Sequence, residues 1–139
     1  MNAFHVMQDL VQIHVQAQDT SDDAAFVIEV TVAPGGGPPP LHTHPAAEFF
    51  YTLDGTLTYF REDEVISGGP GTTAFIPGGV PHTYRNLSDQ PARYLALLTP
   101  GRQMQEFLIE ASGEGRAPDE VLAIGERYGM RTLDVVPAG

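Results

Sequence analysis

The chain has 139 residues and a formal net charge of −11, from 7 basic and 18 acidic residues, and it contains no cysteine. A chain of this length forms about one domain and can bury a hydrophobic core without disulfides or a structural metal. The acidic balance disfavours nucleic acid and anionic membranes as partners, and the lack of cysteine excludes thiolate metal sites, iron–sulfur clusters and a cysteine nucleophile.

Short strands joined by turns are expected, because glycine and proline, with 15 and 12 residues, punctuate the whole chain. Alternating or β-branched patterns predict strands over residues 10–15, 26–32, 48–53, 56–61, 65–66, 72–76, 82–87 and 92–98. Turn signals separate these segments at intervals of about 8–12 residues, which is typical of an antiparallel sandwich or barrel.

Three of the connections have a distinctive composition. Residues 34–40, Pro-Gly-Gly-Gly-Pro-Pro-Pro, predict a rigid loop rather than a linker between domains, since consecutive prolines extend and stiffen the chain. Asp54-Gly55 predicts a two-residue hairpin with a positive φ at the glycine. The acidic run 61–64 is interpreted as a solvated turn and not as a metal-binding cluster.

The apolar period changes to that of a helix towards the end of the chain. The residues that share one helical face are Met104, Phe107, Leu108 and Ala111. A second helix is predicted from Pro118 onward, because proline suits a first helical position. We expect both helices to cap the barrel. The whole chain, 1–139, is then one domain, with the barrel at about 8–99 and the helical segment at about 102–130.

Three of the five histidines are placed so that they can share one ion. His42 and His44 leave the same face of an extended segment, with α-carbons ~6.6 Å apart. Glu48 follows at the start of the next predicted strand, and His82 opens another strand after a Pro-Gly turn. Three imidazoles and one carboxylate together suit a divalent transition metal.

The glycines and prolines around these residues complete two longer motifs. The first runs Gly36-x5-His42-x-His44-x3-Glu48-x6-Gly55, and the second runs Gly71-x5-Pro77-x-Gly79-x2-His82-x3-Asn86. At every position of both motifs the chain resembles the cupin superfamily. The resemblance implies an all-β fold, a double-stranded β-helix or jelly-roll barrel with two short C-terminal helices. It also implies one divalent metal ion per chain, held by His42, His44, Glu48 and His82.

The Pro-Gly-rich loop before the histidines and the C-terminal helix that starts at Pro118 are similar to small single-domain cupins of the quercetin-dioxygenase-like group. In that group the ion, which is iron, nickel, manganese or cobalt, holds a flavonol oxygen while dioxygen adds to the ring. Carried over here, Glu48 is both a metal ligand and the catalytic base. The resemblance implies a metal-dependent oxidoreductase of dioxygenase type, acting on a small aromatic or enolic compound.

Other functions of such a barrel stay open at this stage. One is a non-catalytic protein that binds a metal and a small molecule. Another is a metal-dependent isomerase or decarboxylase, whose product would form without oxygen. The identity of the ion is open too, and zinc belongs with iron, nickel, manganese and cobalt among the candidates.

Further residues take supporting roles in this hypothesis. Candidates for the wall of the substrate pocket are Phe50, Phe75, Tyr84, Met104 and Phe107. Asn86, on the same strand face as His82, is expected to tie down its turn or to support the metal ligands from outside. His5 and His14 have no matching partners and are expected to be ordinary strand residues.

The partners and location follow from the same reading of the sequence. We expect a small-molecule substrate and a homodimer, in which the segment Phe4–Val15 adds a strand to the sheet edge of a neighbour. The first residues carry neither a basic nor a long apolar stretch, so no signal peptide is expected. No apolar run approaches the ~20 residues of a membrane span, and a soluble cytoplasmic protein is the expectation.

Overall fold

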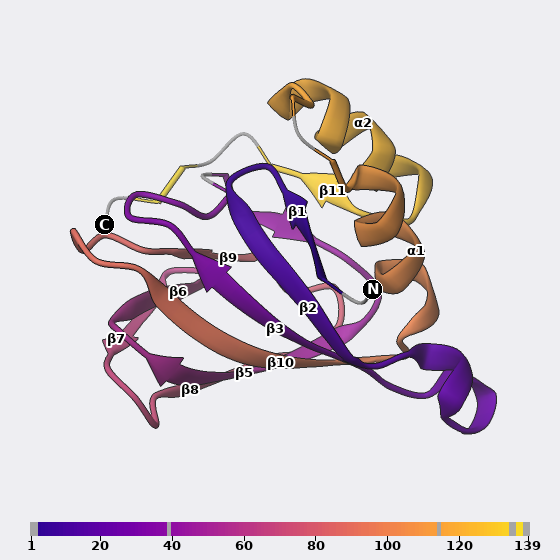
Figure 1. Cartoon of the computed structure of the whole chain (residues 1–139), viewed down its shortest axis with the longest axis horizontal. Coiled ribbons are helices and arrows are strands. Elements are labelled where there is room, and N and C mark those ends of the chain that lie inside the picture. The colour runs from indigo at the N-terminus through magenta and orange to yellow at the C-terminus, as the bar shows by residue number, and fades with distance from the viewer. Residues whose placement is uncertain (1–2, 39, 114, 134–135, 138–139) are drawn as a thin grey trace.

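The computed structural model describes residues 3–38, 40–113, 115–133 and 136–137. Two antiparallel sheets form its framework (Figure 1). The six-stranded sheet has the order β1 (Ala3–Val6), β2 (Asp9–Val15), β3 (Phe26–Val32), β10 (Ala92–Thr99), β5 (Ala47–Asp54) and β8 (Thr73–Ile76). The five-stranded sheet has the order β11 (Arg131–Thr132), β4 (His42–Thr43), β9 (His82–Arg85), β6 (Leu57–Arg61) and β7 (Glu64–Gly68). The predicted all-β jelly-roll class is confirmed.

A single apolar core joins the inner faces of both sheets. Successive side chains of a strand point to opposite faces, so alternate residues of β3 are buried, from Phe26 to Val32. On the facing sheet Leu57 and Tyr59 of β6 are fully buried and belong to the same cluster as Phe50 of β5. Burial of this surface, at ~25 cal/mol per Å², holds the two sheets together.

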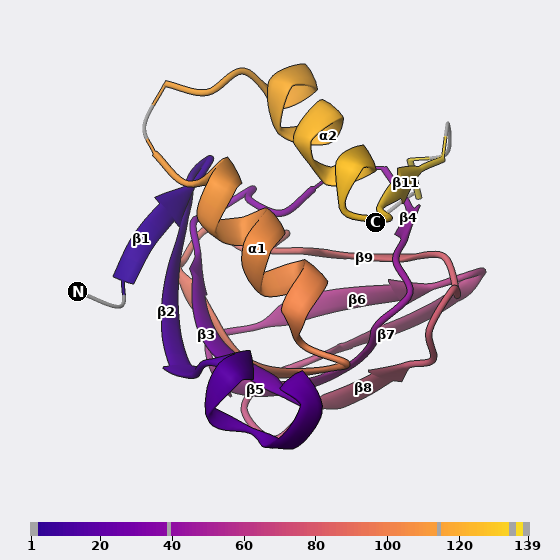
Figure 2. The ribbon, with the colours of Figure 1, turned by 90° about the vertical axis from the view of Figure 1, so that its right-hand side faces the viewer.

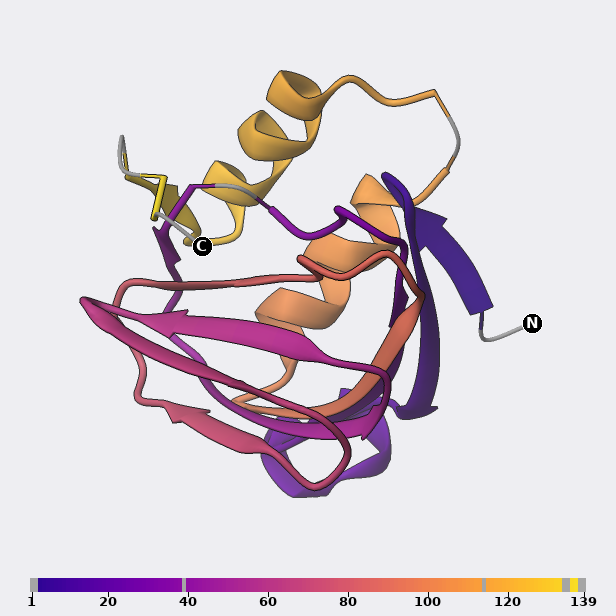
Figure 3. The same ribbon diagram turned by 90° about the vertical axis from the view of Figure 1, so that its left-hand side faces the viewer.

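Two helices follow the last long strand and cover one end of the barrel. In Figure 2, α1 (Arg102–Ala111) crosses the opening between the sheets and α2 (Pro118–Arg127) lies beside it, and in Figure 3 α2 stands above the barrel while α1 lies behind the strands. Their buried apolar residues are Met104, Phe107, Ala111, Val121 and Ile124. The capping role predicted for the helices is confirmed. Within the described ranges no helix is long and apolar enough to cross a membrane.

The N-terminal segment is paired within its own chain, and its addition to a neighbour's sheet stays a prediction. It forms a hairpin with itself, β1 pairing with β2, and β2 pairs with β3 of the same chain. The segment Phe4–Val15 is therefore not a spare arm in this structure, because its hydrogen bonds are made inside its own sheet. The strand β1, the two-residue strands β4 and β11, and 3-10 turns at Ala17–Asp19 and Ser21–Asp23 were not predicted, since segments so short carry no readable period.

The sharp turn at Asp54-Gly55 is confirmed, but the hairpin predicted there is wrong, because β5 and β6 lie in different sheets and do not pair with each other. Gly55 has φ +74°, and its amide donates to the Asp54 carboxylate at 3.0 Å. A Cβ at Gly55 would lie 2.7 Å from the carbonyl oxygen of Pro91, so only glycine fits. The run 61–64 is the predicted turn, in which the guanidinium of Arg61 donates to the exposed carboxylate of Glu64 at 3.1 Å.

Candidate metal centre

Strand pairing brings the three predicted histidines to one point. His42 lies on β4 directly opposite His82 on β9, and His44 follows two residues later on the same face. All three imidazoles are buried, with exposed fractions of 8%, 2% and 2% for His42, His44 and His82. One ring nitrogen from each lies within 4.8 Å of the other two, an arrangement that can hold a metal ion.

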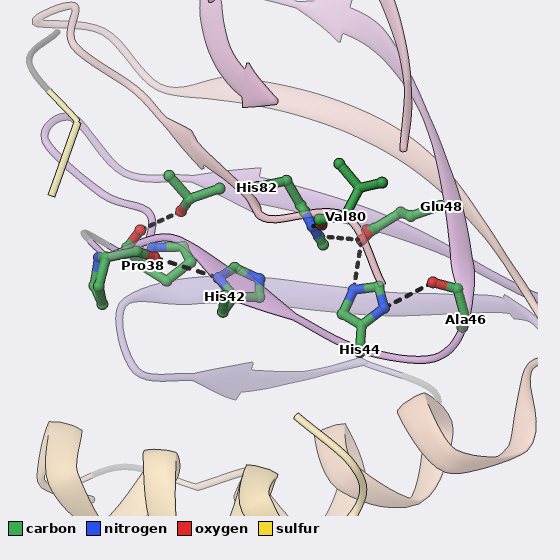
Figure 4. Close-up of polar contacts among 9 residues, drawn as sticks. Pro38, His42, His44, Ala46, Glu48, Val80 and His82 are labelled. Carbon is green, nitrogen blue, oxygen red and sulfur yellow. Dashed lines mark hydrogen bonds and ion pairs between the residues drawn. The ribbon is translucent and has the colours of Figure 1, made fainter. Parts of the chain in front are cut away.

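Each imidazole turns its Nδ1 towards a backbone carbonyl two residues away (Figure 4). The pairs are His42–Pro40 at 3.4 Å, His44–Ala46 at 2.8 Å and His82–Val80 at 2.9 Å. A carbonyl only accepts, so Nδ1 carries the proton in every ring and donates it. This leaves each Nε2 as the atom available to a metal, and the backbone holds the rings in that orientation.

Glu48, on β5, completes the polar group. Its Oε1 lies 3.2 Å from Nε2 of His44 and 3.4 Å from Nε2 of His82 (Figure 4). Burial alone would raise the pKa of Glu48, but the hydrogen bond from His44, the close approach of His82 and the charges of both imidazoles together outweigh burial and hold this pKa at about 2. Burial is the largest single influence on His44 and opposes its charge, yet the hydrogen bond with Glu48, the negative charge of Glu48 and backbone hydrogen bonds together outweigh burial and raise the pKa of His44.

His42 behaves differently because no carboxylate is hydrogen-bonded to it. Burial lowers the pKa of His42 to about 3, and the charges of His82 and His44 act in the same direction. This imidazole is therefore neutral over the whole physiological range. A neutral imidazole is the form that binds a metal ion.

The residues present fit a divalent transition metal. Among the described residues, Nε2 of His82 has no hydrogen-bond partner of normal geometry although it is buried, and an orphaned buried nitrogen calls for an explanation. In a neutral ring Nε2 only accepts hydrogen bonds, and so does the carboxylate of Glu48. These acceptor atoms face one another without a proton to share, and a cation bound between them would satisfy all of them. Three imidazole nitrogens and one carboxylate oxygen are the ligands that iron, nickel, cobalt, manganese and zinc accept.

The metal centre opens into a cavity of about 460 Å³ that reaches the two helices, a volume typical of small-molecule sites. One wall is aromatic: ring centroids of Phe50 and Tyr84 lie 5.1 and 5.0 Å from that of Tyr94. Met104 and Phe107 of α1 line the opposite part. Four of the five predicted wall residues, Phe50, Tyr84, Met104 and Phe107, therefore do line this cavity.

The fifth predicted wall residue, Phe75, is placed wrongly by the sequence. It is 50% exposed on the outer face of β8, because the alternation of that strand turns Ala74 and Ile76 inward instead. Phe75 and Ile76 are both large and apolar and lie on opposite faces of β8, so the sequence of this strand does not show which of the two is buried.

Asn86 serves its turn rather than the metal ligands. Its amide Nδ2 donates to the carbonyl oxygens of Val32 at 3.1 Å and Gln90 at 2.7 Å, and its Oδ1 accepts from the backbone and hydroxyl of Ser88. These bonds use its amide and leave none among the described residues for an imidazole. The expectation that Asn86 supports the ligands from outside is wrong, and the alternative, that it ties down the turn, is right.

Sequence reasoning missed two kinds of group at this site. The first is the set of backbone carbonyls of Pro40, Ala46 and Val80, which no sequence pattern marks because every residue has a backbone carbonyl. Asp9 and Tyr94 also line the cavity, and both had a readable signal, because each is in phase with the buried residues of its strand. His14 is an ordinary exposed strand residue, as predicted, and lies 3.1 Å from the carboxylate of Glu29.

Residues 28–98 match the family of cupin domains, over a span that contains all four predicted metal ligands. The chain belongs to the cupin family. The resemblance found in the two sequence motifs is thus confirmed at this level, while the quercetin-dioxygenase-like group stays a prediction. No curated protein matches the sequence of this cupin.

Solved structures show the same barrel. A sugar phosphate isomerase of the cupin superfamily from Silicibacter pomeroyi has a TM-score of 0.56 and 23% identity, and the match covers 66% of this chain but only 59% of that one. A protein described as a predicted oxalate decarboxylase from Thermotoga maritima has a TM-score of 0.60 and 18% identity over 66% of this cupin and 79% of that chain. A protein from Thermus thermophilus has a TM-score of 0.54 and 28% identity, covering 59% of this cupin and 78% of that chain.

Proposed function

We propose that this cupin is a metal-dependent enzyme of dioxygenase type that acts on a small, uncharged aromatic or enolic compound. The observation that supports it most is the composition of the cavity. The candidate metal centre opens onto aromatic and aliphatic side chains, and no arginine lines the cavity within the described ranges, while the sequence has no lysine. A flat, apolar molecule with one oxygen that can coordinate a metal suits such a space.

The composition of the cavity disfavours the substrates named in the descriptions of two of the three solved neighbours, the sugar phosphate isomerase and the predicted oxalate decarboxylase. Sugar phosphates and oxalate are anions, and proteins commonly hold such groups with arginine or lysine. Of the two carboxyl groups in the described cavity lining, Glu48 is offset by a bound divalent ion, whereas Asp9 would repel an anionic group. The fold is shared, but the electrostatics of this cavity favour a neutral substrate.

Glu48 is proposed to accept the proton of the bound enol or phenol. A carboxylate accepts an acidic O–H proton much more readily than a C–H proton. This favours an enol or phenol substrate over the C–H abstraction of an isomerase. The backbone carbonyls hold the buried imidazoles in orientation, and α1 and α2 cover one end of the cavity. A bound metal ion supplies Lewis acidity and, if redox-active, electron exchange with the co-substrate dioxygen.

Oxygen uptake tests this function. Protein loaded with iron or nickel, in separate preparations checked by elemental analysis, is assayed with flavonols such as quercetin and with β-diketones. The matched control is His82→Ala, which removes one ligand. Uptake well above this control supports the proposal, and no uptake above it for any compound refutes the dioxygenase.

The same assay separates the alternatives. Product that forms equally well without oxygen indicates a metal-dependent isomerase or decarboxylase. A rise in melting temperature with ligand but no turnover indicates a non-catalytic binding protein.

A further inference from the structure

A second polar group faces the cavity at a distance from the histidines. Asp9, the first residue of β2, is 7% exposed and lines the cavity. Its Oδ2 accepts a hydrogen bond from the hydroxyl of Tyr84 at 2.8 Å. Its Oδ1 is buried and makes no hydrogen bond of normal geometry to any residue that the structure describes. A buried carboxyl oxygen without a donor is costly, so a ligand that supplies one would be favoured.

Strand register places Asp9 at the end of the cavity opposite the metal centre. Leu10 pairs with Thr31, which puts Asp9 beside Val32, and Val32 pairs with Ala92 at the start of β10. Glu48 pairs with Leu98, six residues further along β10, and six residues of strand span ~20 Å of backbone. A molecule lying along the cavity therefore has Glu48 at one end and Asp9 at the other.

The surroundings of Asp9 provide no cation. The glycine-rich loop lies close to this carboxyl, since a Cβ on Gly36 would lie only 3.0 Å from Oδ1. Burial raises the pKa of Asp9, and the hydrogen bond from Tyr84 and the nearby backbone amide of Ala33 oppose the rise. None of the arginines in the described ranges forms an ion pair with this carboxyl.

We propose that Asp9 recognises the end of the substrate remote from the metal, its Oδ1 accepting a hydrogen bond from a hydroxyl or amino group there. Tyr84 positions the carboxyl by holding Oδ2. The inference rests on the proposed function and adds to it a substrate requirement: the aromatic or enolic compound carries a second hydrogen-bond donor at its far end. A site built to pair with such a donor discriminates strongly against an analogue that lacks it.

Two probes that differ by one hydroxyl test this requirement. Full-length protein loaded with zinc, which supports no turnover, is titrated with 3-hydroxyflavone and with 3,4′-dihydroxyflavone, and the dissociation constants are measured by calorimetry. The wild type is expected to bind the dihydroxy compound about tenfold more tightly. Asp9→Leu, which is close in size, is expected to bring the ratio of the two constants close to one. A merely structural role of Asp9 would weaken both probes alike and leave the ratio unchanged.

Control variants make each outcome decisive. Asp63→Leu removes a carboxylate from an exposed turn and should keep the wild-type ratio. If thermal unfolding shows that Asp9→Leu is not folded, Asp9→Asn takes its place, with an expected fall in the ratio of at least about threefold. A ratio near one in the wild type, or one unchanged by the Asp9 variants, overturns the role of Asp9 and leaves the proposed function standing. Binding of neither probe above the level of His82→Ala overturns both.

Discussion

Replacing Glu48 by glutamine removes the charge paired with His44 and keeps the size of the side chain. In the metal-free protein the pKa of Glu48 is about 2 against an ordinary 4.5, which corresponds to about 3 kcal/mol of folding free energy at ~1.36 kcal/mol per pKa unit. Because this pKa is lowered in the folded state, the stabilisation is present above pH 4.5 and is lost as the pH falls towards about 2.

His44 sets the other side of the pH window. Its pKa is raised above the ordinary 6.5, so its contribution is fully present below pH 6.5 and is lost as the pH rises through the folded value. The difference in unfolding free energy between wild type and Glu48→Gln should therefore be largest between pH 4.5 and 6.5. The expected maximum is about 3 kcal/mol.

Urea unfolding of chelator-treated protein measures this difference. At about pH 3 the difference in unfolding free energy should have fallen to roughly half of its maximum. At this pH Glu48 is almost fully protonated in the unfolded state but still mostly ionised in the folded state. Glu29→Gln is the matched control: it breaks a pair with Arg93 near the surface, which is worth under ~1 kcal/mol. A Glu48 difference that is equally large at about pH 3 and pH 5.5 would refute the ion pair.

The remaining predictions concern the metal, the core and the assembly. His82→Ala should lose the bound metal in elemental analysis and lose the metal-induced rise in melting temperature, while His14→Ala keeps both. Phe50→Ala, in the core, should lower the unfolding free energy in urea by about 3–5 kcal/mol, and Phe75→Ala, half exposed, by under ~1 kcal/mol. The homodimer stays a prediction: solution scattering should give twice the monomer mass, and Phe49→Glu, which introduces a charge among exposed apolar side chains on neighbouring strands, should shift it towards monomer.

The sequence by itself determined the barrel and the candidate ligands. The alternation of side chains along a strand placed His42 and His44 on one face. The glycines of the two motifs marked the turns that return the chain, so that Glu48 and His82 come back towards these two histidines. These features are local or depend on spacing, because strand alternation and turn conformation are set by neighbouring residues. The pairing of His42 with His82 then follows from the topology of the barrel.

Only the tertiary structure decided which strand faces are buried and which charged groups are paired. Phe75 points outward and Ile76 inward because of which sheet face packs on the core, and either phase satisfies the sequence of β8. Asp9 is buried because Tyr84, 75 residues away, and the glycine-rich loop close over it. Arg93, out of phase with the buried residues of β10, is paired with Glu29 near the surface, 64 residues away. Burial and charge pairing depend on residues far apart in the chain, and only the folded molecule brings those residues into contact.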